Sequence, residues 1–153
     1  HLSSAFLMRA HRIPHFRHQL ASKCRLHLSV LHETVLAKRI LFCRLDRNGN
    51  GYEYLDELTE SEDECFAIVE LDAPIPVFND LTCIVSKMDL DACGKECRLA
   101  FHGAIVDRHV SLESFPLFRV KERTARIDRI AGPGKLIGTG LVDRDGGLLD
   151  KFI

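Results

Sequence analysis

Five residues that can offer oxygen ligands to a cation lie within twelve positions near the middle of the chain. They are Asp46, Asn48, Asn50, Tyr52 and Glu57. The first three would offer side-chain oxygens to a cation, Tyr52 its backbone carbonyl, and Glu57 both carboxylate oxygens, which suits Ca²⁺. Gly51 stands where such a loop turns sharply. The spacing predicts a Ca²⁺ site over residues 46–57, and the alternative is a metal-free Asn-Gly hairpin turn.

This segment resembles the calcium loop of the EF-hand family, with Asp46 at its first position and Glu57 at its last. The resemblance implies a mainly α fold, an EF-hand pair whose two loops touch through a short β contact. Before the loop, Leu41, Phe42 and Leu45 have the three-to-four spacing of an amphipathic helix.

A second segment, residues 89–100, repeats part of the pattern 43 positions later. At the positions that correspond to Asp46, Asn48, Asn50 and Tyr52, this segment has Asp89, Asp91, Cys93 and Lys95. Cys93 is a soft ligand that suits Ca²⁺ poorly, and Ala100 offers no carboxylate at the last position. We therefore expect a degenerate loop without metal.

The six cysteines are Cys24, Cys43, Cys65, Cys83, Cys93 and Cys97. Their even number, and a first residue His1 in place of Met, favour three disulfides and a secreted, extracellular protein. Their pairing stays open, because six cysteines allow 15 connectivities. Buried thiols of a cytosolic protein are the alternative, and a zinc site ranks below both.

Charge is unevenly distributed along the 153 residues, although the net charge is only −1. Residues 1–44 hold eight Lys or Arg and a single acidic residue, Glu33, whereas residues 45–115 hold sixteen acidic and five basic residues. This segregation suits a homo-oligomer or an assembly with other extracellular proteins. The overall balance gives no strong positive field, so no nucleic-acid partner is expected. No apolar run approaches the ~20 residues that span a bilayer.

Histidines concentrate near the start of the chain, where His11, His15 and His18 have ligand-like spacing. Pro14 interrupts any helix that would align them, so surface histidines are the preferred interpretation. The segment 143–150 resembles the start of a further loop, with an Asp-Gly turn as the alternative. Common hydrolase and phosphate-loop motifs are absent from the sequence, which predicts a protein without enzymatic activity.

Together these patterns predict three regions. They are a basic helical extension over 1–29, an EF-hand pair over 30–106 with loops 46–57 and 89–100, and an irregular segment over 107–153 that packs on the pair. The expected function is a secreted calcium-binding structural protein, in which Ca²⁺ and disulfides rigidify a protein-interaction surface. The alternatives are an intracellular EF-hand calcium sensor, or a secreted enzyme with an unrecognised calcium-supported site.

Overall fold

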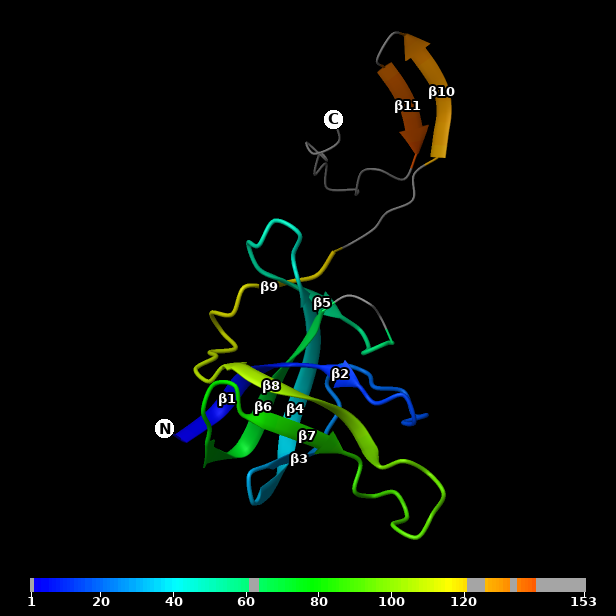
Figure 1. Ribbon diagram of the computed structural model, residues 1–153. Coiled ribbons are helices and arrows are strands. Elements are labelled where there is room, and N and C mark those ends of the chain that lie inside the picture. The colour runs from blue at the N-terminus through cyan, green and yellow to red at the C-terminus, as the bar shows by residue number, and fades with distance from the viewer. Residues whose placement is uncertain (1, 61–63, 121–125, 133–134, 140–153) are drawn as a thin grey trace. The chain divides into compact units, whose positions relative to one another are not determined.

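The computed structural model describes residues 2–60, 64–120, 126–132 and 135–139, and these residues form strands and loops without a helix (Figure 1). The chain divides into two units, His1–Arg119 and Val120–Ile153. The strands of the first unit are β1 (Leu2–Arg9), β2 (His11–Arg12), β3 (His27–Val30), β4 (Glu33–Leu45), β5 (Tyr52–Leu55), β6 (Cys65–Pro76), β7 (Thr82–Ser86), β8 (Leu99–Asp107) and β9 (Leu117–Phe118). The second unit contains an antiparallel pair, β10 (Arg126–Gly132) and β11 (Lys135–Thr139).

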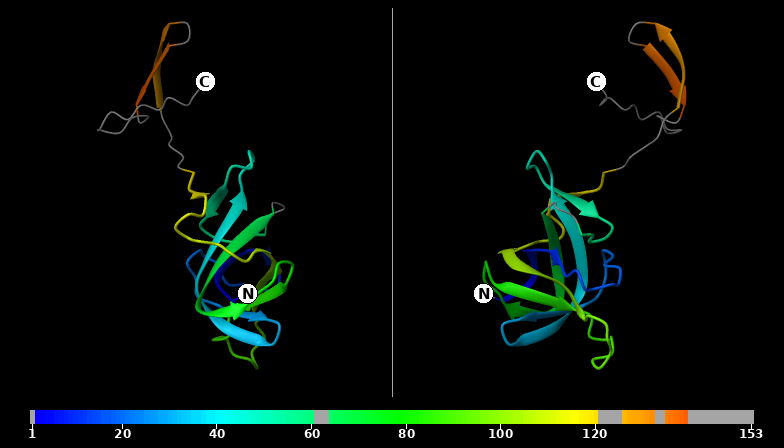
Figure 2. Two further views of the ribbon diagram at one scale, coloured as in Figure 1. Left: turned by 90° about the vertical axis from the view of Figure 1, so that its left-hand side faces the viewer. Right: turned by 45° about the vertical axis from the view of Figure 1, so that its right-hand side comes forward.

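Six strands of the first unit close into an antiparallel barrel (Figures 1 and 2). The strand order is β3-β7-β8-β1-β6-β4, and the pairing of β3 with β4 returns the sheet to its starting strand. Beyond β4 the sheet continues into β5 and then β9, which runs parallel to β5. Closure leaves the barrel strands without an unpaired edge, which is a stable solution for an all-β domain.

The barrel interior is filled by large side chains that alternate along the strands. Phe42 of β4 and Phe101 of β8 meet edge to face, with ring centroids 5.4 Å apart, and both are fully buried. Phe6 and Met8 of β1 are also fully buried in this cluster. Period-two alternation, which places every second residue inside, brings these positions together from strands distant in sequence.

At Gly103 the backbone of β8 comes very close to that of β1. A Cβ atom at this position would collide with the carbonyl group of Arg9. Only glycine permits such an approach, so this residue is required where β1 crosses onto β8.

The segment after β8, residues 108–119, crosses the outer face of β1, β6 and β4, and we call it the strap. Val110 of the strap completes a second apolar cluster with Leu7, Leu41, Cys43, Phe66 and Ile68 of the barrel strands. Phe115 of the strap stacks on Tyr52 of β5, with ring centroids 4.9 Å apart. Strands β4 and β6 are therefore buried on both faces along part of their length, which explains the continuous apolar runs at 40–43 and 65–69.

The predicted mainly α fold is wrong. Leu41 and Phe42, interpreted as one face of a helix, lie in β4 and point to opposite faces of the sheet, one under the strap and one inside the barrel. Apolar runs buried on two sides mimic helical spacing, because the alternation between polar and apolar residues disappears. The expected helical extension over 1–29 contains β1, β2 and the start of β3, and the expected EF-hand pair over 30–106 is part of the barrel.

The predicted disulfides are also absent, because the structure records all six cysteines as thiols. Cys43, Cys65 and Cys83 are buried in β4, β6 and β7, whereas Cys93 is exposed in the loop between β7 and β8. Buried cysteines act here as small apolar side chains, which was the alternative interpretation of the sequence. Among the described residues, no helix is long and apolar enough to cross a membrane.

Candidate functional site

The loop between β2 and β3, residues 13–26, is long but closely anchored. Phe16 and Leu20 point into the barrel and are each only 2% exposed. Arg12 of β2 holds the loop from inside: its Nη1 donates to the carbonyl of Leu58 at 3.0 Å, and its Nη2 to the carbonyls of Phe16 at 3.0 Å and His18 at 2.8 Å. The guanidinium fork thereby fixes three backbone positions at once.

The same loop is joined to the β4–β5 hairpin through Ser22. Its Oγ donates to the carbonyl of Leu55 at 2.6 Å and accepts the amide N–H of Phe42 at 2.8 Å. The backbone N–H of Ser22 donates to the carbonyl of Asp56 at 2.7 Å. These bonds satisfy groups at the end of the barrel and give the loop a defined conformation.

The loop between β7 and β8, residues 87–98, lies next to loop 13–26 and is closed by its own hydrogen bonds. Lys87 N donates to the carbonyl of Arg98 at 2.8 Å, and Arg98 Nη2 donates to the carbonyl of Met88 at 2.6 Å. At the tip, Asp91 accepts the N–H of Cys93 at 3.0 Å through its side chain and that of Gly94 at 3.2 Å through its carbonyl. The tip is therefore a self-contained Asx turn.

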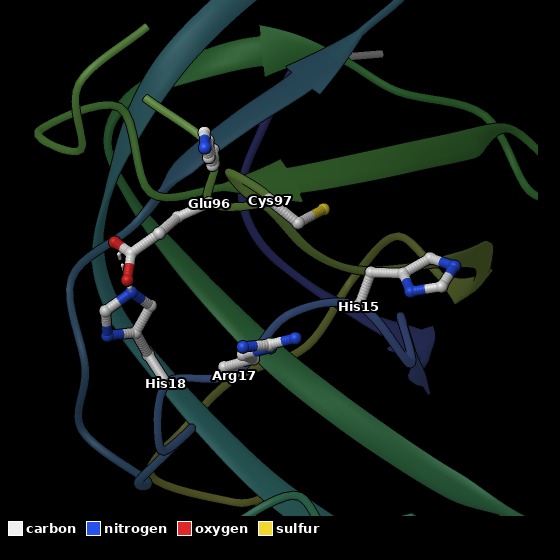
Figure 3. A pocket seen from close by; sticks show the side chains of 6 residues that line it. His15, Arg17, His18, Glu96 and Cys97 are labelled. Atoms are coloured by element: carbon white, nitrogen blue, oxygen red, sulfur yellow. Dashed lines mark ion pairs between the residues drawn. The ribbon is translucent and has the colours of Figure 1, made fainter. Parts of the chain in front are cut away.

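A cleft of about 460 Å³ separates these two loops (Figure 3). We call it the basic cleft. Its lining residues are His15, Arg17, His18, Lys95, Glu96 and Cys97. Arg17 and Lys95 bring permanent positive charges from different loops, and both side chains are exposed. Within the described part of the chain, Glu96 is the single carboxylate of the lining.

One ion pair crosses the cleft between His18 and Glu96, which face each other in Figure 3. His18 Nε2 lies 3.3 Å from Glu96 Oε2, and the contact is ionic when the imidazole is protonated. Nε2 is buried and makes no hydrogen bond within the described part of the chain. Buried polar atoms are normally hydrogen-bonded, so a ligand with a polar group at this position would be favourable.

Positive charge in the cleft comes from both loops, with Arg17 on one side and Lys95 on the other. Residues 1–32 contain five Lys or Arg and no acidic residue. Three of these basic residues, Arg17, Lys23 and Arg25, lie on loop 13–26 and are exposed. Such a local excess of positive charge attracts anions even in a protein whose net charge is −1.

The residues predicted to bind Ca²⁺ lie on and beyond the β4–β5 hairpin, without the helices on which the EF-hand interpretation depended. The turn is closed by Asp46, whose N–H donates to the carbonyl of Gly51 at 2.9 Å and whose Oδ2 accepts the N–H of Asn48 at 3.2 Å. Glu57 accepts a hydrogen bond from Gln19 Nε2 at 2.7 Å. The backbone of this segment is the hairpin turn that the sequence offered as the alternative.

Ca²⁺ binding by Asp46, Asn48, Asn50, Tyr52 and Glu57 stays a prediction, as does the metal-free state of Asp89, Asp91, Cys93 and Lys95. The latter four lie in loop 87–98, where Lys95 lines the basic cleft. Among the described residues, no group of three or more His, Cys, Asp or Glu is placed to hold a metal ion. The segment 143–150 lies outside the described residues.

The N-terminal histidines are dispersed over different surroundings. His11 of β2 lies against His102 of β8, with ring centroids 5.5 Å apart, whereas His15 and His18 line the basic cleft. Sequence reasoning missed the anchoring roles of Arg12, Phe16 and Leu20. The absence of acidic residues from positions 1–32 was a usable signal for the positive surface.

The closed antiparallel barrel is a fold found in translation elongation factors. Two crystal structures of translation elongation factor SelB from Methanococcus maripaludis share it. The apo form matches with a TM-score of 0.70 and 19% identity, covering 93% of this chain and 30% of that one. The complex with the GTP analogue GppNHp matches with a TM-score of 0.74 and 17% identity, with the same coverage. Likeness at these identities establishes the fold alone.

The family itself is established by sequence. The model of the family described as selenocysteine-specific elongation factor, eukaryotes, third domain, matches residues 7–56 and 46–103, and the chain belongs to this family. The mouse selenocysteine-specific elongation factor is 26% identical over an alignment 190 positions long, gaps included, which covers 95% of this chain and 32% of the mouse protein. The chain thus spans about a third of the length of these relatives.

These findings correct the functional interpretation of the sequence. The EF-hand assignment is wrong, because the chain belongs to a family of elongation factors and its fold is a barrel. Neither a secreted calcium-binding structural protein nor a calcium sensor fits this family. The predicted extracellular location is wrong for the same reason, since translation takes place inside the cell.

Proposed function

We propose that this chain is a barrel module of a selenocysteine-specific translation elongation factor, and that it serves as a non-enzymatic contact surface for RNA. The observation that supports this most strongly is the family match, which spans nearly the whole barrel from residue 7 to residue 103. An elongation factor specific for selenocysteine must act on the transfer RNA that bears this amino acid. The expectation of no nucleic-acid partner conflicts with such a role.

The charge of loop 13–26 supports an RNA partner. Protein contacts to RNA draw most of their affinity from Lys and Arg that neutralise phosphates. The exposed Arg17 and Lys23 meet this requirement on a loop whose backbone is fixed by Arg12 and Ser22, whereas Arg25 of the same loop is paired with Asp72 at 3.6 Å. A fixed loop loses little conformational entropy on binding, which favours recognition of a rigid RNA.

A direct binding experiment tests the proposal with the 153-residue chain. Fluorescence anisotropy would compare a selenocysteine transfer RNA, an ordinary elongator transfer RNA and a DNA duplex of similar length. We expect the transfer RNAs to bind in the micromolar range at low salt, with affinity falling steeply as salt rises. Equal binding of the duplex, or no binding of either RNA at low salt, would contradict an RNA-contact role.

A further inference from the structure

We propose that the basic cleft is a phosphate-binding site that takes a phosphodiester of an RNA strand, with Arg17 and Lys95 as direct contacts and Glu96 as an opposing charge that limits affinity. The inference rests on the proposed RNA-contact role and assigns it to particular side chains. It concerns a site between loop 13–26 and loop 87–98, which are joined by the His18–Glu96 ion pair.

The donor groups of the cleft suit a phosphate. Arg17 offers a planar fork of N–H groups and Lys95 a compact ammonium, the two side chains that bind phosphate oxygens most often. His15 and His18 add ring nitrogens that donate or accept according to their protonation state. The buried Nε2 of His18 makes no hydrogen bond within the described residues, with Glu96 as its charged neighbour at 3.3 Å, and as an N–H group it would donate to a phosphate oxygen.

The size of the cleft agrees with this ligand. A volume of about 460 Å³ exceeds by far the ~30 Å³ that one water occupies, so a phosphate group fits together with several bridging waters. Arg17 and Lys95, which line the cleft, are both exposed to solvent. A continuous strand can therefore pass across it without entering a closed cavity.

Both sides of the cleft are held before any ligand arrives. On one side, Arg12 Nη2 fixes the carbonyls of Phe16 and His18, which flank Arg17 in sequence. On the other side, the pairing of Lys87 with Arg98 closes the loop that bears Lys95 and Glu96. Charges on fixed backbones bind with a smaller loss of entropy than charges on free loops.

Glu96 has the opposite effect on a bound anion. Its carboxylate is 60% exposed, and it faces His18 across the same space. A phosphate in the cleft would be repelled by this charge and would have to compete for His18. Removing the charge should therefore strengthen binding, a change of sign that loss of structure alone would not produce.

The test measures binding of a fluorescent transfer RNA to the full 153-residue chain and its variants at several salt concentrations. We expect Arg17→Ala and Lys95→Ala each to weaken binding about tenfold and to reduce the salt slope by roughly one phosphate contact. Glu96→Gln should strengthen binding about threefold. Arg47→Ala, which removes an exposed cation from the β4–β5 hairpin, is the matched control and should change affinity less than about twofold.

A second measurement separates the cleft from the proposed function. The ring signals of His15 and His18 would be followed by NMR during titration with inorganic phosphate, and then with RNA. If RNA binds the wild-type chain but the three cleft variants behave like Arg47→Ala, the basic cleft is not the phosphate site, whereas the proposed RNA-contact role is retained. If phosphate shifts the two histidines while RNA does not bind, the site holds a free phosphate and the RNA role fails. If neither ligand shifts them, the inference is wrong.

Discussion

A Cβ atom built on Gly51 would lie 2.8 Å from the carbonyl oxygen of Pro116, because the strap passes directly over the end of the β4–β5 hairpin. The same carbonyl accepts the N–H of Tyr52 at 2.8 Å. The glycine that suggested a calcium loop is therefore needed for a close approach of two backbones. It allows Phe115 to reach Tyr52, and β9 to pair with β5.

Replacement of this glycine should loosen the strap. We expect Gly51→Ala to lower the free energy of unfolding by about 1–3 kcal/mol, because a backbone oxygen cannot move aside as cheaply as a side chain. The amide of Tyr52 should also exchange its hydrogen faster. Urea unfolding and hydrogen exchange would measure the two effects.

The matched control for this change lies two residues earlier in the same hairpin. Gly49 has a φ of 69° and open space around its missing Cβ. Gly49→Asn should cost little, since asparagine adopts this left-handed conformation readily. If the Gly51→Ala variant kept the stability of the wild type and its rate of hydrogen exchange at Tyr52, the strap would not depend on this contact.

A second prediction concerns Ser22, which joins loop 13–26 to the β4–β5 hairpin. Ser22→Ala leaves the N–H of Phe42 and the carbonyl of Leu55 without the hydroxyl that both contact. Loss of partners for such partly buried groups should lower the free energy of unfolding by about 1–3 kcal/mol. Ser29→Ala is the control, because Ser29 Oγ contacts Thr34 Oγ1 on the exposed surface, and its effect should stay below ~0.5 kcal/mol. Equal effects of the two changes in urea unfolding would refute the anchoring role of Ser22.

A third prediction uses Glu70 of β6, which contacts two cations of β4. Its carboxylate lies 3.0 Å from Lys38 Nζ and 2.9 Å from Arg39 Nη2. The hydrogen bond from Lys38, together with the charge of Arg39, lowers the pKa of Glu70 despite the opposing effect of burial. The stabilisation is therefore present above the ordinary pKa of a glutamate and is lost as pH falls through the lowered value.

We expect Glu70→Gln to cost about 1 kcal/mol at pH 7, a modest value because Lys38 and Arg39 are largely exposed. The difference from wild type should shrink steadily in urea unfolding below pH 4. Glu33→Gln, which removes a more exposed carboxylate, serves as the control. A difference that grows on acidification would mean that the lowered pKa is assigned to the wrong group.

The sequence allowed prediction of the presence of a core, but it did not allow prediction of the barrel. Leu41 and Phe42 are both buried, as their spacing suggested, yet burial on two faces of a strand removed the alternation that identifies β structure. The strap is the physical cause, and it comes from residues more than sixty positions later in the chain. Contacts over such distances leave no local pattern.

The candidate site could be predicted only in part. Asn50 and Gly51 indicated a turn correctly, because turn chemistry is local. The helices on either side were inferred from family likeness and from apolar spacing, and both signals were misleading here. The basic cleft is lined by Arg17 and Lys95, which are far apart in sequence and lie in the same cleft because the barrel closes. A Ca²⁺ titration of wild type and Glu57→Ala would test the remaining calcium prediction, since a bound ion must first displace Gln19 from Glu57.

The last prediction concerns the buried thiols and alkaline pH. Burial raises the pKa of Cys43 and of Cys83 to about 12, and the nearby Cys65 adds to the rise at Cys43. Burial also raises the pKa of Cys24 to about 11. In the unfolded chain the same thiols ionise near their ordinary value of 9.0. Above that pH the unfolded state has lost protons that the folded state keeps. The free energy of unfolding should therefore fall as pH rises from about 9 toward 12, by up to about 1.4 kcal/mol per pH unit for each thiol.

Urea unfolding of wild type and Cys83→Ala between pH 8 and pH 11 would measure this effect. The variant loses stability at all pH values because of its cavity, but its further decline with pH should be shallower than that of wild type. Comparison of the two slopes cancels the titration of tyrosines and lysines. In parallel, iodoacetamide at pH 8 should label the exposed Cys93 well before Cys43 or Cys83. Parallel pH slopes, or early labelling of Cys83, would show that this thiol is not protected by the barrel.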